Sequence, residues 1–81
     1  MEKNNERIFT FEVNSNGKEV EIHLNEEGLD EFIAALIRLK KSKGSNHDHF
    51  MTKSWGGDEL TEAKQSEKNM LMNKATVHLW R

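Results

Sequence analysis

The chain has 81 residues, of which 35% are hydrophobic and 32% charged, with a formal net charge of −2 and no cysteine. A chain of this length holds one thin core, which leaves little apolar surface for a deep substrate pocket. The slight acidity argues against a nucleic-acid partner, and the lack of cysteine excludes disulfides, thiolate catalysis and cysteine-rich zinc sites.

The first predicted elements are two strands, at about residues 7–13 and 18–24. Apolar and polar residues alternate in both segments, as in strands with one buried face. Asn16 and Gly17, which lie between them, are the favoured pair for a two-residue type I′ turn. This turn sets the apolar residues opposite one another on one face: Phe9 with Leu24, Phe11 with Ile22, and Val13 with Val20.

The same register sets Glu12 opposite Glu21 on the second face of the hairpin. Like charges in direct opposition are destabilising. We therefore expect this face to be wet or to be reserved for a basic partner. Glu12 and Glu21 become candidate partner-binding residues.

A helix of about four turns is predicted at residues 26–41. Asn25 is a suitable N-cap, acidic residues fill the first turns, and basic residues fill the end before Gly44. Apolar residues recur at three- and four-residue intervals and form one stripe, wide enough to cover a sheet face. We expect this stripe to lie over four residues of the hairpin: Phe9, Phe11, Val20 and Ile22.

Two further strands are predicted at about residues 47–52 and 75–80, with a long loop at about residues 53–70 between them. The first of these strands is the weaker in pattern. The order ββαββ indicates a single α+β domain over residues 1–81. Its architecture is a four-stranded antiparallel sheet with one helix packed across one face.

Three of the four histidines could share the sheet face opposite the helix, and three imidazoles on one face would suit zinc. This arrangement requires a particular strand order, and exposed histidines on strands are common without any ligand. A metal site at His23, His49 and His78 is therefore an alternative, while the main expectation is no metal and no cofactor. No nucleophile or oxyanion site accompanies the histidines, so we predict no catalytic residue and no enzyme.

Trp55, Gly56, Gly57, Asp58 and Glu59 form a short motif inside the predicted loop. The two glycines suit a tight turn. Two interpretations of Trp55 stay open. Its indole could pack over the sheet edge as part of the fold, or it could be an exposed anchor for a partner, flanked by the two acids.

The segment HDHFMTKSWGGDEL at residues 47–60, followed by the terminal strand VHLW, resembles the immunity protein 32 family of bacterial polymorphic toxin systems. That family has an H-x-H-L-M-T strand, then S-W-G-G-D-E-L, a variable polar loop, and a last strand of the V-x-I-x-x-W kind. This chain has Phe50 where leucine is usual and Lys53 where proline is common. The helix with its Glu27-Gly28 pair also resembles the family.

The resemblance implies an immunity protein that binds and neutralises a cognate toxin, encoded by an adjacent gene, by stoichiometric protein–protein interaction. It matches His49, Gly56 and Gly57 to the family, together with Trp55, Asp58 and Glu59. We predict partner contact for His49, Trp55, Asp58 and Glu59, and a motif or structural turn for the two glycines. An oligomeric adaptor with an exposed edge strand is a further alternative.

The first nine residues have no apolar signal core, and the longest apolar run, residues 32–37, is far short of the roughly 20 residues that span a bilayer. Nothing in the sequence directs export or membrane insertion. We therefore expect a cytoplasmic protein.

Overall fold

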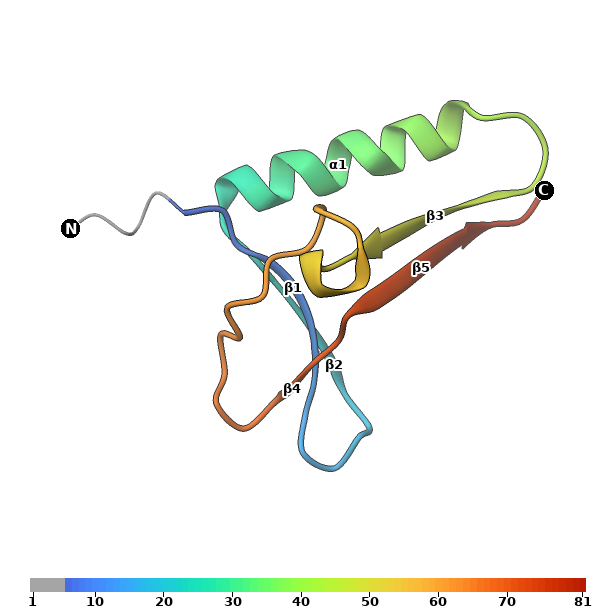
Figure 1. The fold of residues 1–81 in the computed structure, drawn as a ribbon. Helices are drawn as coiled ribbons and strands as arrows, with labels where there is room; N and C mark the ends of the chain where they lie inside the picture. Colours follow the sequence, from blue (N-terminus) through green and yellow to red (C-terminus); the bar gives the residue numbers. More distant parts are fainter. Residues whose placement is uncertain (1–5) are drawn as a thin grey trace.

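The computed structural model describes residues 6–81, so that most of the N-terminal segment examined for an export signal lies outside the described residues. The elements in chain order are β1 (Phe9–Val13), β2 (Val20–Leu24), α1 (Glu26–Lys41), β3 (Asn46–Met51), the 3-10 helix η2 (Lys53–Trp55), β4 (Met70–Leu71) and β5 (Lys74–Leu79). Figure 1 shows α1 above the strands, with the β1–β2 hairpin and the β3–β5 pair diverging beneath it. Across residues 6–81, no helix is long and apolar enough to cross a membrane.

The predicted register of the hairpin is confirmed, with Phe11 opposite Ile22 and Glu12 opposite Glu21. The turn itself differs from the prediction, because Gly17 has a positive φ of 74° and Asn16 does not. The loop is wider than a type I′ turn, and the side chains of Asn14 and Asn16 accept hydrogen bonds from the Lys18 N–H at 3.2 and 2.8 Å. The two side chains thus provide acceptors for the Lys18 N–H, a backbone donor near the end of the loop.

The strands form two sheets, of order β2-β1-β4 and β3-β5, and the prediction of one four-stranded sheet is wrong. The reason lies at Met72 and Asn73, where the last stretch of chain changes partner. The Met72 N–H donates to the Phe11 carbonyl at 2.8 Å, whereas the Asn73 carbonyl accepts from the Thr52 N–H at 3.0 Å. The chain therefore leaves β1 and joins β3 within two residues.

The core lies under α1 and is largely aromatic. Phe9 and Phe50 are 1% and 2% exposed, and Phe32 from the helix meets their rings at centroid distances of 5.1 and 5.6 Å. The helix covers Phe9 but does not cover Val20 and Ile22, which are 65% and 44% exposed, so that part of the prediction is wrong. Figure 1 shows why: the hairpin runs away from α1 toward its turn.

Asn25 ties the start of α1 to the residue before β1. Its side-chain oxygen accepts hydrogen bonds from the Gly28 and Ile8 N–H groups, both at 2.9 Å. Asn25→Ala leaves both donors without this acceptor, and we expect the free energy of unfolding to fall by about 1–2 kcal/mol in urea titrations. Asn16→Ala in the exposed turn is the matched control, with an expected loss below about 0.5 kcal/mol. Equal losses in the two variants would contradict the role of Asn25.

Candidate partner-binding surface

The motif segment turns back sharply after β3, and its two glycines serve that turn. Gly56 has a φ of 93°, a conformation that favours glycine. The Gly57 N–H donates to the Thr52 carbonyl at 3.0 Å, and a Cβ on Gly57 would lie 2.8 Å from the Met51 carbonyl oxygen. A larger residue at either position would disturb the turn, so both glycines are parts of the fold.

Glu59 and Leu60 fasten the far end of the same turn. A Glu59 carboxylate oxygen accepts from the Met51 N–H at 3.0 Å, and Leu60 is 3% exposed in the core. Arg7 donates to the backbone carbonyls of Asp58, at 2.9 Å, and Glu59. These hydrogen bonds tie the motif backbone to Met51 of β3 and to Arg7, just before β1.

Trp55 and Asp58 differ from the rest of the motif because their side chains face outward. Trp55 is 58% exposed, and the Asp58 side chain is exposed as well. Within residues 6–81, neither side chain takes part in a hydrogen bond. Their positions are fixed by a rigid turn while the side chains remain accessible, which favours the interpretation of Trp55 as an exposed anchor.

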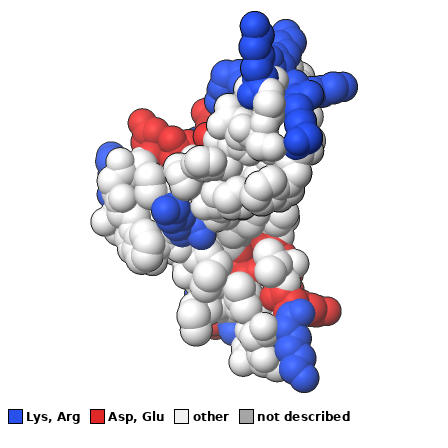
Figure 2. All heavy atoms as spheres, turned by 90° about the vertical axis from the view of Figure 1, so that its right-hand side faces the viewer, with Lys and Arg blue, Asp and Glu red and all other residues white. Residues whose placement is uncertain are grey.

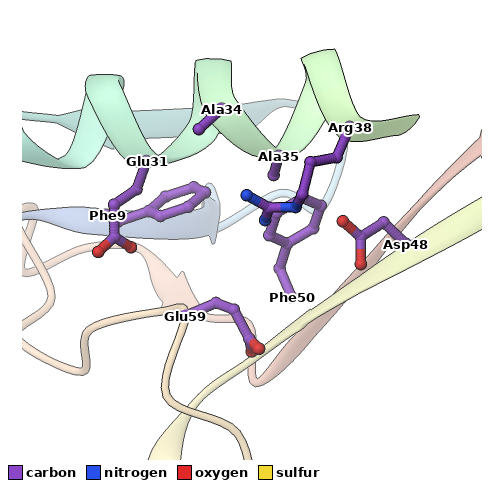
Figure 3. Close-up of a pocket in the computed structure, with 8 residues that line it drawn as sticks. All are labelled: Phe9, Glu31, Ala34, Ala35, Arg38, Asp48, Phe50 and Glu59. Atoms are coloured by element: carbon purple, nitrogen blue, oxygen red, sulfur yellow. The ribbon is translucent and has the colours of Figure 1, made fainter. Parts of the chain in front are cut away.

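A pocket of about 300 Å³ lies beside the motif, between α1 and β3. Phe9, Ala35 and Phe50 form its apolar part, and Ala34 also borders it. Figure 3 shows the charged side chains around this space, namely Glu31, Arg38, Asp48 and Glu59. Glu31 is already paired with Arg7 at 2.9 Å, so the carboxylates of Asp48 and Glu59 are the ones left to complement a basic group of a partner at the mouth of the pocket.

In a comparison with known protein families, the family model of immunity protein 32 matches residues 19–74. This range runs from the hairpin through α1 and the whole motif to the start of β5. The chain belongs to the immunity protein 32 family. No curated protein and no solved structure matches the chain.

Glu12 does not lie on a solvent-exposed face, and that prediction is wrong. Its side chain is fully buried beneath the segment 62–69. The carboxylate accepts hydrogen bonds from four donors, which are the Thr10 hydroxyl at 2.7 Å, the N–H groups of Gln65 and Ser66 at 2.8 and 3.3 Å, and the Asn69 side-chain amide at 3.1 Å. Glu12 is thus unavailable to a partner and instead anchors the loop that covers it.

Glu21 belongs to the same cluster and is half-buried. It accepts from the Asn69 side-chain amide and lies against a His23 ring nitrogen, both at 2.9 Å. Burial would raise the pKa of Glu12, but the hydrogen bonds from Gln65, Thr10, Asn69 and Ser66 outweigh it and lower that pKa from 4.5 to about 2. Hydrogen bonds from Asn69 and His23 also lower the pKa of Glu21. Both groups are therefore anionic at neutral pH. The side-chain amide of Asn69 lies between the two carboxylates and donates a hydrogen bond to each.

The fold does not bring together His23, His49 and His78, the three histidines predicted to share a face. His23 lies in the cluster with Glu12 and Glu21, whereas His49 and His78 lie on the outer face of the β3–β5 sheet. His47 occupies that outer face instead, directly opposite His78. The spacing of two residues between His47 and His49 indicates that they share a face of β3. That His78 lies on the same face could be known only from the pairing of β3 with β5.

Several apolar residues of the α1 stripe, which we predicted to lie over the hairpin, are exposed instead. Leu29, Ile33, Leu36 and Ile37 are 37–46% exposed. A groove of about 410 Å³ lies between α1 and β5 and is lined by Leu36, Leu39, Lys40, Val77, His78, Leu79 and Arg81. Figure 2 views the side on which α1 ends, with Lys and Arg gathered at the top and mostly uncharged residues across the middle, where one basic side chain interrupts them. The narrow sheets leave this flank of the helix uncovered.

Proposed function

We propose that this immunity protein binds a cognate toxin in a one-to-one complex and blocks the toxin without turning over a substrate. The observation that carries the proposal is the match of residues 19–74 to immunity protein 32. The toxin gene is expected beside the gene for this chain, and neutralisation is expected in the cytoplasm of the producing cell.

We place the contact at the motif side of the molecule. Trp55 supplies a large, exposed aromatic side chain on a rigid turn, which is the type of residue that dominates binding energy in protein interfaces. Asp58 and the carboxylates around the neighbouring pocket add negative charge. A basic side chain of the toxin would complement that charge and enter the pocket. His49 and Glu21, which we also predicted to bind a partner, lie outside this surface.

The test of immunity is co-expression with the protein encoded by the adjacent gene. Cell survival and co-purification at equal stoichiometry are the expected results. Analytical ultracentrifugation of the purified complex checks the one-to-one ratio and also reveals any self-association through the exposed flank of α1. A neighbour that kills regardless, or that does not bind, would contradict the proposed function.

Trp55→Ala is expected to weaken toxin binding by about tenfold to a hundredfold, because it removes the aromatic anchor. The free energy of unfolding should change by less than about 0.5 kcal/mol, since the indole is exposed. Trp80→Ala is the matched control, as Trp80 is 78% exposed but lies on β5's outer side. Isothermal titration calorimetry compares the two. Weaker binding in Trp80→Ala alone would move the contact to the other side while leaving the immunity function in place.

A further inference from the structure

Three imidazoles gather on the outer face of the β3–β5 sheet. His47 and His49 are two residues apart on β3, so they point to the same side, and His78 on β5 is paired directly with His47. All three side chains are exposed. The ring centroid of His47 lies 4.8 Å from that of His49 and 5.4 Å from that of His78. His47 is therefore the centre of the group.

Two of the three ring separations, His47 to His49 and His47 to His78, match those of imidazoles that share one metal ion. With metal–nitrogen bonds of about 2.0–2.1 Å and tetrahedral angles, the ring centres of two ligands lie about 5 Å apart. His49 and His78 occupy a diagonal of the sheet, so one of these exposed rings must rotate to complete the set. Such rotations in exposed side chains are fast.

One neighbouring contact already resembles that of a metal ligand. The Nδ1 atom of His49 lies 3.1 Å from the Thr76 hydroxyl. This hydrogen bond holds the ring and leaves Nε2 available, as outer hydrogen bonds do for ligating histidines. The cluster of Glu12, Glu21 and His23 has close ligand atoms too, within 4.8 Å of one another, but its carboxylates are already occupied by hydrogen bonds from the fold.

We propose that His47, His49 and His78 form a binding site for one divalent transition-metal ion of the Zn²⁺, Ni²⁺ or Cu²⁺ type. Neutral imidazole nitrogens favour these borderline ions over Mg²⁺ and Ca²⁺, which prefer oxygen. Three protein ligands leave a further coordination position open to water or to another donor. The site is separate from the motif surface and does not depend on toxin binding.

Trp80 offers a direct probe of the site, because its ring is stacked on His78 at a centroid distance of 5.8 Å and an interplanar angle of 11°. The chain has two tryptophans, so Trp55→Phe leaves Trp80 as the single indole. We expect Ni²⁺ added to this untagged variant at neutral pH to quench the fluorescence, with saturation at one equivalent. Zn²⁺, which does not quench, should compete and restore the signal, and acidification should release the metal because the ligands must be neutral.

His47→Gln in the same background should weaken Ni²⁺ binding by at least about tenfold, as it removes the central ligand. His23→Gln is the matched control and should leave the titration unchanged. Circular dichroism of both variants checks that the fold is intact. Quenching that never saturates, or affinity that is lost in His23→Gln or kept in His47→Gln, would overturn the proposal.

Discussion

Glu12→Gln is expected to lower the free energy of unfolding at neutral pH by about 3 kcal/mol. The carboxylate of Glu12 is fully buried and accepts from four donors. An amide keeps only one acceptor oxygen and sets its own NH₂ group against these donors, so several buried polar groups lose their partners. Hydrogen exchange of the Gln65 and Ser66 amides should accelerate, because the segment they belong to loses its anchor.

The pH dependence gives a second and independent check. The pKa of Glu12 is about 2 in the folded chain against 4.5 as its ordinary value, so the unfolded state binds more protons between these limits. The corresponding stability, about 3 kcal/mol, is fully present above pH 4.5 and is lost as the pH falls through about 2. Urea titrations at several pH values between these limits give the free energy of unfolding as a function of pH. This free energy should change less steeply with pH in Glu12→Gln than in the native chain.

Glu19→Gln is the control for both measurements. Glu19 is exposed near the hairpin turn and accepts one hydrogen bond from the Asn14 side chain at 3.0 Å. Its replacement should change the free energy of unfolding by less than about 0.5 kcal/mol. If the two variants lose equal stability, or if Glu12→Gln keeps the native pH dependence, the anchoring role of Glu12 is wrong.

The elements that could be predicted are those specified by nearby residues. The hairpin register follows from alternation on both sides of Asn16 and Gly17, and it is the same whether the turn has two residues or four. The helix follows from its cap, its charges and its apolar spacing. Both patterns lie within short windows of the sequence, where local physical rules apply.

The separation into two sheets could not be predicted, because it depends on contacts across long stretches of chain. β4 has two residues and no strand pattern of its own, and its pairing with β1 is made by residues about 60 positions apart. The burial of Glu12 has the same origin. From the hairpin alone its side chain faces water, and the segment 62–69, which reads as a polar loop, covers it and supplies three of its four donors.

For the candidate site, too, some features could be predicted from the sequence and others needed the folded structure. The motif was recognisable as a unit, yet the sequence could not separate Gly57 and Glu59, which hold the turn, from Trp55, which the turn exposes. That distinction needs the hydrogen bonds of the folded backbone. The exposed flank of α1 was missed because an amphipathic stripe shows that a helix has an apolar face, but not how much of that face the sheet can cover.

Gly28→Ala is expected to destabilise the chain by about 3 kcal/mol or more, although alanine is the better helix former by about 1 kcal/mol. Gly28 is buried in the first turn of α1, and a Cβ there would lie 1.8 Å from the Ile8 carbonyl oxygen. Ile8 cannot withdraw freely, since its carbonyl accepts from the Asn25 N–H at 3.2 Å and its own N–H donates to the Asn25 side chain. Relief of the clash therefore breaks the junction between β1 and α1.

The sign of this change distinguishes packing from helix propensity, because the two predict opposite results. Gly44→Ala is the matched control: Gly44 has a φ of 66° but no atom within 4 Å of a Cβ, so only backbone strain of about 1 kcal/mol is expected. Urea titrations followed by circular dichroism compare the two variants with the native chain. A Gly28→Ala chain as stable as the native one would mean that Ile8 and the start of β1 can move aside at little cost. The Asn25 hydrogen bonds would then not fix the position of the helix.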